Sequence, residues 1–343
     1  MRVTMKEIAE RAGVHQATVD KVVHNRVGVS DEVRAKVQAI IDELGYKPNP
    51  TGRVLQRQGK KYRIYAILVD VDALPYLKNG IEQGLKEWAG FDIEITHAVT
   101  GFQEAKRQSE YIDKAVLDKA DGIILSPINA DCVRKAVNRA VDAGITVITT
   151  NADIKGTKRH WCVGADNAQG AHIAGRMMGL FLGGKGRIAV VSSAIASENN
   201  NCYVQLRENE FKRFVQETYP DIQIVTTIDS FEDPQITYEK TAQLLRDYQD
   251  LQGLYITCGG VSQVGRALEE SGRAKDIRVI SYEDYPEVVE FVRKDVIDCT
   301  LAGEIQKQGE IPVQLIMDHL VFGKQPENDQ VFTEIKVIVK ESL

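Results

Sequence analysis

The sequence is poor in cysteine and has no long apolar run. Its cysteines are odd in number, widely spaced and free of any CxxC motif; they stand at 132, 162, 202, 258 and 299. This pattern excludes a disulfide-stapled scaffold and indicates reduced thiols in a cytoplasmic protein. No stretch approaches the roughly 18 apolar residues of a spanning helix. No apolar segment follows the basic residue of MRVTMKEIAE, so we expect no secretory signal and no membrane association.

Signatures of catalysis and of metal binding are missing as well. The six histidines form no HExxH pair and no tight group with cysteine, which argues against a metal site. Gly183-Gly-Lys-Gly precedes a predicted strand, whereas a phosphate-binding loop must follow one, so we interpret it as a helix-to-strand turn. Ser192-Ser193 lacks the GxSxG pattern of hydrolases. His160-Trp161-Cys162 is interpreted as local packing. We therefore predict no catalytic residue, no metal and no cofactor.

Charge is distributed unevenly along a chain of otherwise ordinary composition. Hydrophobic residues make up 43% and charged residues 27%, as in soluble globular proteins. Residues 1–63 hold 13 Lys and Arg against 7 Asp and Glu, whereas the remaining residues hold 30 against 42. A basic N-terminal sixth on an acidic body fits a small nucleic-acid-binding headpiece. A solvated charged surface explains the charge equally well, so other features must decide.

The first 45 residues have the pattern of three short helices. Thr4 and Glu7 fit a capping box, and Gly13 ends the first helix. A second helix begins near His15, and Ser30 caps a third. The apolar positions predicted to face a shared core are Ile8, Ala12, Val19, Val22, Val23, Val33, Val37, Ile40, Ile41 and Leu44. Two helices joined by a tight turn, with a third across them, are typical of a helix-turn-helix unit, although generic three-helix bundles share the pattern.

The residues themselves are more specific than their spacing. The stretch Met5-Lys-Glu-Ile-Ala-Glu-Arg-Ala-Gly-Val-His-Gln-Ala-Thr-Val-Asp-Lys-Val-Val, followed by Val29-Ser30 and by Gly45-Tyr-Lys-Pro-Asn, resembles the headpiece of the lactose-repressor (LacI/GalR) family of bacterial transcription regulators. The match runs without gaps through about 58 residues. The resemblance implies DNA contacts for Met5, Gln16, Ala17, Thr18, Lys21, His24, Ser30, Asn49 and Leu55.

The implied roles agree with the chemistry of these side chains. Gln16 and Ala17 would open the recognition helix, where glutamine reads adenine and an alanine methyl touches the thymine methyl. Thr18 would bind a phosphate, and Met5 and Ser30 would lie near the DNA backbone. Lys21 stands where the family usually has an arginine that reads guanine, and it lacks the planar fork of that residue.

Three departures from the family predict an atypical operator. His15 replaces the usual serine at the start of the recognition helix, and Asp20 replaces a small hydroxyl residue. His24 and Asn25 stand where asparagine and glycine are usual. His15 and His24 are equally well explained as histidines on a helix surface.

A basic segment at 48–62 is expected to join this headpiece, at 1–47, to the rest of the chain. Prolines at 48 and 50 break the third helix. The resemblance implies that the segment becomes helical on the operator, with Leu55 as an apolar wedge in the minor groove. Gly52 replaces the usual alanine, which lowers helix stability by ~1 kcal/mol. A flexible linker is the alternative.

From residue 63 onward, short apolar runs alternate with helical patterns. Strands are predicted at 63–70, 92–98, 122–126, 146–150, 187–192, 222–227, 253–257, 278–282 and 297–301. Helices are predicted at about 77–89, 103–118, 131–143, 167–182, 203–217, 235–248, 261–271, 286–293 and 304–321. This alternation indicates an α/β fold of doubly wound parallel sheets, and its length favours two lobes.

The order of these elements resembles sugar receptors of the ribose-binding-protein type. The resemblance implies a ligand-binding and dimerisation domain at 63–343, with one lobe of 63–164 plus 304–326 and another of 165–303 plus 327–343. Ligands of open α/β sheets bind at the carboxyl ends of strands, which here would face each other across a cleft. The candidate ligand residues are Tyr76, Asn151, Gln205, Glu283 and Glu304; loop capping or solvent exposure is the alternative for each.

These features predict a homodimeric, sequence-specific DNA-binding regulator, expected to be a repressor. Two headpieces would bind an approximately palindromic double-stranded operator. A small molecule between the lobes would modulate operator affinity. We expect a sugar or polyol, although asparagine at 151 and glutamine at 205 remove charges that are usual in sugar receptors. The alternatives are a stand-alone solute-binding protein, disfavoured by the basic headpiece, and an α/β enzyme on a similar scaffold.

Overall fold

The computed structural model describes residues 5–23, 28–44, 59–193, 202–231, 233–325 and 327–343. The chain separates into two compact units, Met1–Gln58 and Gly59–Leu343. The predictions for His24, Asn25, Asn49, Gly52 and Leu55 lie outside the described residues, as does the predicted cap at Thr4.

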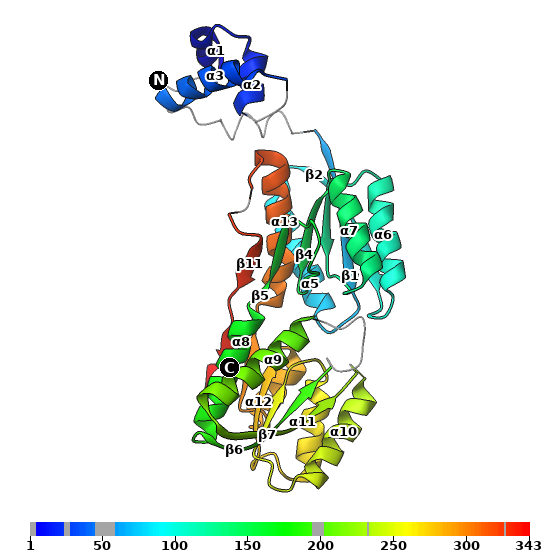
Figure 1. The fold of residues 1–343 in the computed structure, drawn as a ribbon. Coiled ribbons are helices and arrows are strands. Elements are labelled where there is room, and N and C mark those ends of the chain that lie inside the picture. The colour runs from blue at the N-terminus through cyan, green and yellow to red at the C-terminus, as the bar shows by residue number, and fades with distance from the viewer. Residues whose placement is uncertain (1–4, 24–27, 45–58, 194–201, 232, 326) are drawn as a thin grey trace. The chain divides into compact units, whose positions relative to one another are not determined.

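The first unit contains the three predicted helices, α1 (Met5–Ala12), α2 (Gln16–Val23) and α3 (Asp31–Glu43), seen at the N-terminal end of the chain in Figure 1. Their apolar faces form one core, whose buried members are Ile8, Ala9, Ala12, Val19, Val22 and Val37. Gly13 has φ +66°, a conformation that lets the chain leave α1 and begin α2 three residues later. The helical pattern of the sequence is therefore confirmed here.

The second unit is built on two sheets of six strands each. The first sheet has the order β11-β5-β4-β3-β1-β2, and all of its strand pairs are parallel. Its strands are β1 (Lys61–Val69), β2 (Asp92–Thr100), β3 (Gly122–Leu125), β4 (Thr146–Thr150), β5 (Trp161–Ala165) and β11 (Gln330–Thr333). The apolar side chains of β3 are fully buried, as expected for a strand covered on both faces.

The second sheet has the order β12-β10-β9-β8-β6-β7, and only the edge strand β12 is antiparallel to its neighbour. Its strands are β6 (Lys185–Ser192), β7 (Asp221–Asp229), β8 (Gly253–Ile256), β9 (Arg278–Tyr282), β10 (Cys299–Ala302) and β12 (Lys336–Ile338). Each sheet forms the centre of one lobe, which confirms the predicted α/β class.

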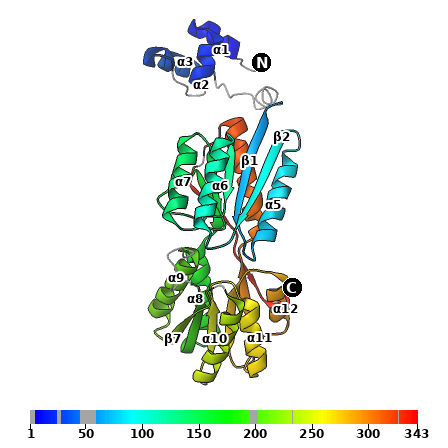
Figure 2. The same cartoon turned by 90° about the vertical axis from the view of Figure 1, so that its right-hand side faces the viewer.

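Helices cover both faces of each sheet, as Figures 1 and 2 show. Those of the first lobe are α5 (Leu74–Glu87), α6 (Ala105–Leu117), α7 (Asp131–Asp142) and α13 (Ile305–Met317), which continues into a π-helical turn at Asp318–Phe322. Those of the second are α8 (Asn167–Phe181), α9 (Cys202–Thr218), α10 (Pro234–Asp247), α11 (Val261–Ser271) and α12 (Pro286–Arg293), and a short 3-10 helix follows at Lys340–Ser342. None of the helices in the described part is long and apolar enough to span a membrane.

Helices α5 and α13 approach each other backbone to backbone. A Cβ atom on Gly80 would lie 1.9 Å from the carbonyl oxygen of Gln306, and one on Gly309 would lie 2.2 Å from that of Leu77. Only glycine permits this spacing, because any larger residue would force the two backbones apart. The two helices therefore form one rigid layer of the first lobe.

The chain crosses between the lobes three times, after β5, after β10 and after β11. The predicted division at 326/327 is wrong, because β11 pairs with β5 in the first sheet and the third crossover follows Thr333. The sequence analysis also missed β5, β11 and β12. No helix lies between β4 and β5, which breaks the expected alternation, and β11 is an edge strand whose Phe332 is 57% exposed.

Candidate functional site

One face of α2 in the headpiece is exposed. Gln16, Ala17 and Lys21 are exposed, and Thr18 is half-buried, whereas Val19 on the opposite face is fully buried. The buried stripe holds α2 on the headpiece core. The predicted base-reading side chains are thus free to contact a ligand, which is the arrangement required of a recognition helix.

His15 caps the start of α2. Its Nδ1 accepts a hydrogen bond from the Ala17 amide at 3.3 Å, and its carbonyl oxygen accepts one from the Thr18 amide at 2.8 Å. A helix leaves its first amides without helical partners, and a side-chain acceptor at this position stabilises it. The His15 imidazole therefore caps α2. The sequence analysis considered His15 as a DNA contact or as a surface histidine, and it did not consider a capping role.

The other two predicted headpiece residues within the described part take part in the fold of this unit. The Ser30 hydroxyl accepts a hydrogen bond from the Val33 amide at 3.4 Å, which confirms the predicted cap of α3. Met5 is half-buried and packs against the headpiece core. Ser30 is exposed, so its hydroxyl is also accessible from solvent.

The basic residues at the start of β1 contact carboxylates of the first lobe. Lys60 Nζ lies 2.7 Å from Asp121 Oδ1, and the Arg63 amide donates to Asp121 Oδ2 at 2.9 Å. Lys61 lies 3.1 Å from Glu94. Two of the cations counted in the predicted hinge therefore contribute to holding the start of β1 on the body.

A small hollow lies at the carboxyl ends of β1, β3 and β4, the edge where a ligand was predicted. Apolar side chains line most of it, including Phe102 and Ile128, and Asn129 and Asn151 add amide groups. Cys202 of α9, from the second lobe, also lines it. Its volume is about 30 Å³, enough for a water molecule and too small for a sugar ring.

Asn151 is the one predicted ligand residue that lines this hollow. It follows β4 with φ +60°, a left-handed conformation that asparagine tolerates better than most residues. Its Nδ2 lies 3.5 Å from Gln308 Oε1, at the long limit of a hydrogen bond. The amide is thus held weakly and can exchange its partner.

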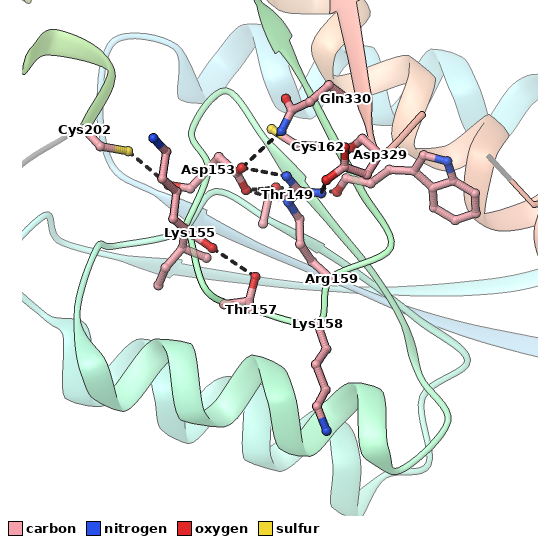
Figure 3. A network of polar contacts seen from close by, with 12 residues as sticks. Thr149, Asp153, Lys155, Thr157, Lys158, Arg159, Cys162, Cys202, Asp329 and Gln330 are labelled. Atoms are coloured by element: carbon pink, nitrogen blue, oxygen red, sulfur yellow. Dashed lines mark hydrogen bonds and ion pairs between the residues drawn. The ribbon is translucent and has the colours of Figure 1, made fainter. Parts of the chain in front are cut away.

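Beside Asn151, Asp153 and Arg159 form a buried ion pair, shown in Figure 3. Thr149 and Gln330 also donate to the Asp153 carboxylate, at 2.9 and 3.3 Å. Burial alone would raise the pKa of Asp153, but the hydrogen bonds and charge of Arg159 outweigh it and hold that pKa below its usual range. The Cys202 thiol donates to the Asp153 carbonyl oxygen at 3.2 Å, which joins this cluster to the second lobe.

A second buried pair occupies the facing lobe. Arg207 Nη2 lies 3.5 Å from Glu283 Oε1, and the guanidinium lies 3.7 Å from the ring centroid of Tyr282. Arg207 also donates to Asn167 Oδ1 and to the Thr257 carbonyl oxygen, at 2.5 and 3.2 Å. Burial raises the pKa of Glu283, and the charge of Arg207 opposes this.

The sequence analysis missed Arg207 and selected Gln205 instead. Gln205 is exposed, and no described contact joins it to the other predicted residues. The helical phase was the available signal: Val204, Glu208 and Phe211 are the buried positions of α9, and Arg207 lies next to them around the helix. The arginine that is usual in sugar receptors near position 205 therefore has a counterpart two residues later, at Arg207.

The remaining predicted residues lie at the junction of the lobes. Tyr76 stacks on Tyr285 with ring centroids 4.8 Å apart and an interplanar angle of 23°, so one face of its ring is covered by a residue of the other lobe. Glu304 pairs with Lys307 at 3.1 Å and with Lys336 at 2.9 Å. These contacts tie Glu304 to the crossovers and away from the hollow.

Comparisons with known proteins agree with both units. The model described as "Bacterial regulatory proteins, lacI family" matches residues 4–49, and the model described as "Periplasmic binding protein domain" matches residues 65–325. The chain belongs to the family of the periplasmic binding protein domain, whose model covers most of it, and its N-terminal residues match the lacI model. The lacI model describes regulatory proteins, and this match favours a regulator over the enzyme alternative.

One curated relative is a repressor by name. The Ribose operon repressor of Lactococcus lactis subsp. lactis (strain IL1403) is 27% identical over 227 residues, which cover 63% of this chain and 64% of that protein. The matched region thus spans less than two thirds of the relative's own length.

Two solved structures share the fold of the periplasmic binding protein domain. One is the solute-binding protein of an ABC transporter from Burkholderia graminis C4D1M in complex with D-arabinose, with TM-score 0.75, 20% identity and coverage of 82% of this chain and 96% of that chain. The other is GanP, a glucose-galactose binding protein from Geobacillus stearothermophilus, with TM-score 0.72, 25% identity and coverage of 83% and 99%.

Proposed function

We propose that this lacI-family chain is a homodimeric transcriptional repressor of the cytoplasm whose affinity for an approximately palindromic operator depends on a sugar or polyol bound between its lobes. The observation that carries the proposal is the pairing, on one chain, of a helix-turn-helix with an exposed recognition face and a two-lobed domain with a cleft at the strand ends. Neither a stand-alone solute-binding protein nor an enzyme needs the first of these.

The exposed face of α2 supplies the chemistry for reading DNA. Gln16 offers an amide that pairs with adenine, and Lys21 offers an ammonium for guanine O6 and N7. Two copies of α2, held by a dimer, would reach successive major grooves of a duplex. Base contacts of this kind discriminate sequences, whereas phosphate contacts fix the register of the headpiece.

The cleft favours a ligand without net charge. Asp153 in the hollow and Glu283 in the facing lobe are buried carboxylates that already pair with Arg159 and Arg207. A charged ligand would have to break such a pair, and a buried ion pair that loses one partner becomes strongly destabilising. Amide groups and apolar walls remain for binding, a combination that suits hydroxyl-bearing rings. The ribose, arabinose, glucose and galactose in the names of the relatives belong to this class.

The experiment that tests the proposal is selection from a random duplex library by the full-length protein, with and without a mixture of neutral sugars. We expect enrichment of a near-palindrome with two half-sites about one helical turn apart. Enrichment of a single half-site would refute the dimer. No enrichment under either condition, together with sugar binding that survives removal of residues 1–58, would instead establish a solute-binding protein.

A further inference from the structure

The side chain of Gln308 lies where the three crossovers between the lobes meet. Gln308 is 2% exposed, and its Nε2 donates to the Gly303 carbonyl oxygen at 2.7 Å and to Thr333 Oγ1 at 3.3 Å. Gly303 follows β10, and Thr333 ends β11. A Cβ atom built on Gly303 would lie 3.0 Å from the Cβ of Ala165, the last residue of β5. The amide group of Gln308 therefore contacts two crossovers, and one of these, at Gly303, lies close to the third.

The other end of the same amide faces the cleft. Gln308 Oε1 accepts the hydrogen bond from Asn151 Nδ2, and Asn151 lines the hollow at the strand ends. On the opposite side, the Gly303 amide donates to Glu283 Oε2 at 3.4 Å, and Glu283 pairs with Arg207. A continuous set of polar contacts thus runs from the cleft floor of the first lobe, through Gln308, to the buried ion pair of the second.

The helix that carries Gln308 cannot easily follow a movement of the second lobe. Gly309, the next residue, is in backbone contact with Leu77 of α5, so α13 is fixed within the first lobe. A rotation of the lobes changes the backbone at Gly303 and after Thr333. Gln308 therefore stays in place when the crossovers move. In the present arrangement of the lobes, its side-chain amide donates to both Gly303 and Thr333.

We propose that Gln308 is a positioning residue that couples occupation of the cleft to rotation of the lobes. In the structure, Gln308 holds the crossovers in a single arrangement, while its oxygen accepts the hydrogen bond of the Asn151 amide. A hydroxyl-bearing ligand competes for the Asn151 amide at little cost, because the hydrogen bond that it replaces is long. The freed amide of Gln308 can then turn, and the crossovers change with it. This inference rests on the proposed function for its biological meaning, but its test needs neither DNA nor sugar.

The test measures the distance between the lobes in the full-length protein. Spin labels are placed on Cys132, an exposed thiol of the first lobe, and on Q235C, at an exposed position of the second. Labelled chains are mixed with excess unlabelled chains so that only distances within one chain are recorded. A sample with native Gln235 measures any labelling of the other cysteines. Pulsed electron paramagnetic resonance then gives the distribution of distances.

Two substitutions on α13 are compared in this background. Q308M replaces the buried amide with an apolar side chain of similar size, and Q306M makes the same change at an exposed position two residues away. We expect Q308M to widen the distance distribution about twofold or more, since several lobe arrangements become populated. Q306M should leave it unchanged. A role of Gln308 in packing alone would lower the unfolding temperature without moving the distance between the lobes.

The outcomes separate cleanly. A distribution for Q308M that coincides with that of the unsubstituted protein, or an equal widening in Q306M, overturns the proposal. If Q308M fails to fold, T333V is measured in its place. This change keeps Gln308 and removes the Thr333 hydroxyl, which accepts a hydrogen bond from Gln308 and donates one to the Gly303 carbonyl oxygen. T333V should widen the distribution in the same way, and an unchanged T333V distribution overturns the proposal. Failure of the operator selection described above would leave these results unaffected.

Discussion

Arg159 binds Asp153 through two parallel hydrogen bonds, from Nε to Oδ1 at 2.6 Å and from Nη2 to Oδ2 at 2.7 Å. Both side chains are almost fully buried, with exposures of 8% and 11%. Asp153 lines the hollow together with Asn151, at the edge where the second lobe makes contact through Cys202. Removal of this ion pair is expected to have a measurable cost.

The first prediction concerns this pair. Arg159→Met leaves a buried carboxylate without its cation and should lower the free energy of unfolding at pH 7 by about 3–5 kcal/mol. Urea unfolding measures the loss. Arg139→Met is the matched control, because Arg139 pairs with Asp113 in the same two-pronged way at half-exposed positions. The control should lose at most about 1 kcal/mol, and equal losses in both variants would contradict the account.

The same pair predicts a dependence on pH. The pKa of Asp153 is lowered in the folded protein, so the pair stabilises the protein above the pKa of the unfolded carboxyl, near 3.9, and this contribution is lost as the pH falls through the folded value. In Arg159→Met the buried carboxyl can take up a proton instead. The deficit of the variant should therefore be largest near pH 7 and shrink towards pH 4. A deficit that is constant over this range would show that lost packing, not charge, causes it.

The histidine cap of the recognition helix gives a third prediction. His15→Ala removes the acceptor for the Ala17 amide and should cost the headpiece about 0.5–2 kcal/mol, whereas His15→Ser restores a capping hydroxyl and should cost less. Hydrogen exchange at the Ala17 amide, followed by NMR, is the sensitive measurement. Faster exchange in His15→Ala than in His15→Ser is expected. Identical rates in the two variants would remove the capping role.

Lys21 is predicted to read a base. Lys21→Ala should weaken binding to the selected operator by about 1–3 kcal/mol and relax the preference at one position in each half-site. Lys36→Ala changes an exposed lysine of α3 and serves as the control. The measurement is the affinity of each variant for operators substituted one base pair at a time. A loss that is equal for all sequences would make Lys21 a phosphate contact.

The close contact between α5 and α13 predicts that a methyl group at Gly80 lowers the stability of the protein. Gly80→Ala places a methyl group against the Gln306 carbonyl oxygen and should destabilise the protein by about 1–3 kcal/mol or more. Gly90→Ala meets no atom within 4 Å and should change the unfolding free energy by less than about 0.5 kcal/mol. Thermal unfolding of both variants checks the difference, and a tolerated Gly80→Ala would contradict the rigid layer assumed for Gln308.

The central strands and the helices of this fold could be predicted from the sequence, whereas the strands next to the crossovers could not. Central strands such as β3 and β8 are continuous apolar runs, which identifies them without a structure. β5 was missed because it follows β4 without a helix, an exception to the usual parallel connection. β11 was missed because an edge strand with an exposed Phe332 lacks a continuous apolar pattern.

In the candidate cleft, too, local patterns could be predicted from the sequence and long-range contacts could not. The place of Asn151 at the strand ends could be predicted because it directly follows the buried strand β4. Arg207 was missed because its position depends on the phase of α9, and Tyr76 was expected to stack on a ligand although Tyr285 of the other lobe already covers one face of its ring. Contacts between residues more than 50 positions apart, such as Asn151 with Gln308, leave no local pattern in the sequence.

The central claim is that one ligand-binding event in the cleft changes the affinity for DNA. The most direct measurement determines the dissociation constant for the selected operator with and without saturating neutral sugar, and that for the sugar with and without saturating operator. Thermodynamic linkage requires the two ratios to be equal. The account predicts equal ratios of about five or more, in either direction, for at least one sugar that binds. A sugar that binds the cleft and leaves the operator affinity unchanged would contradict it.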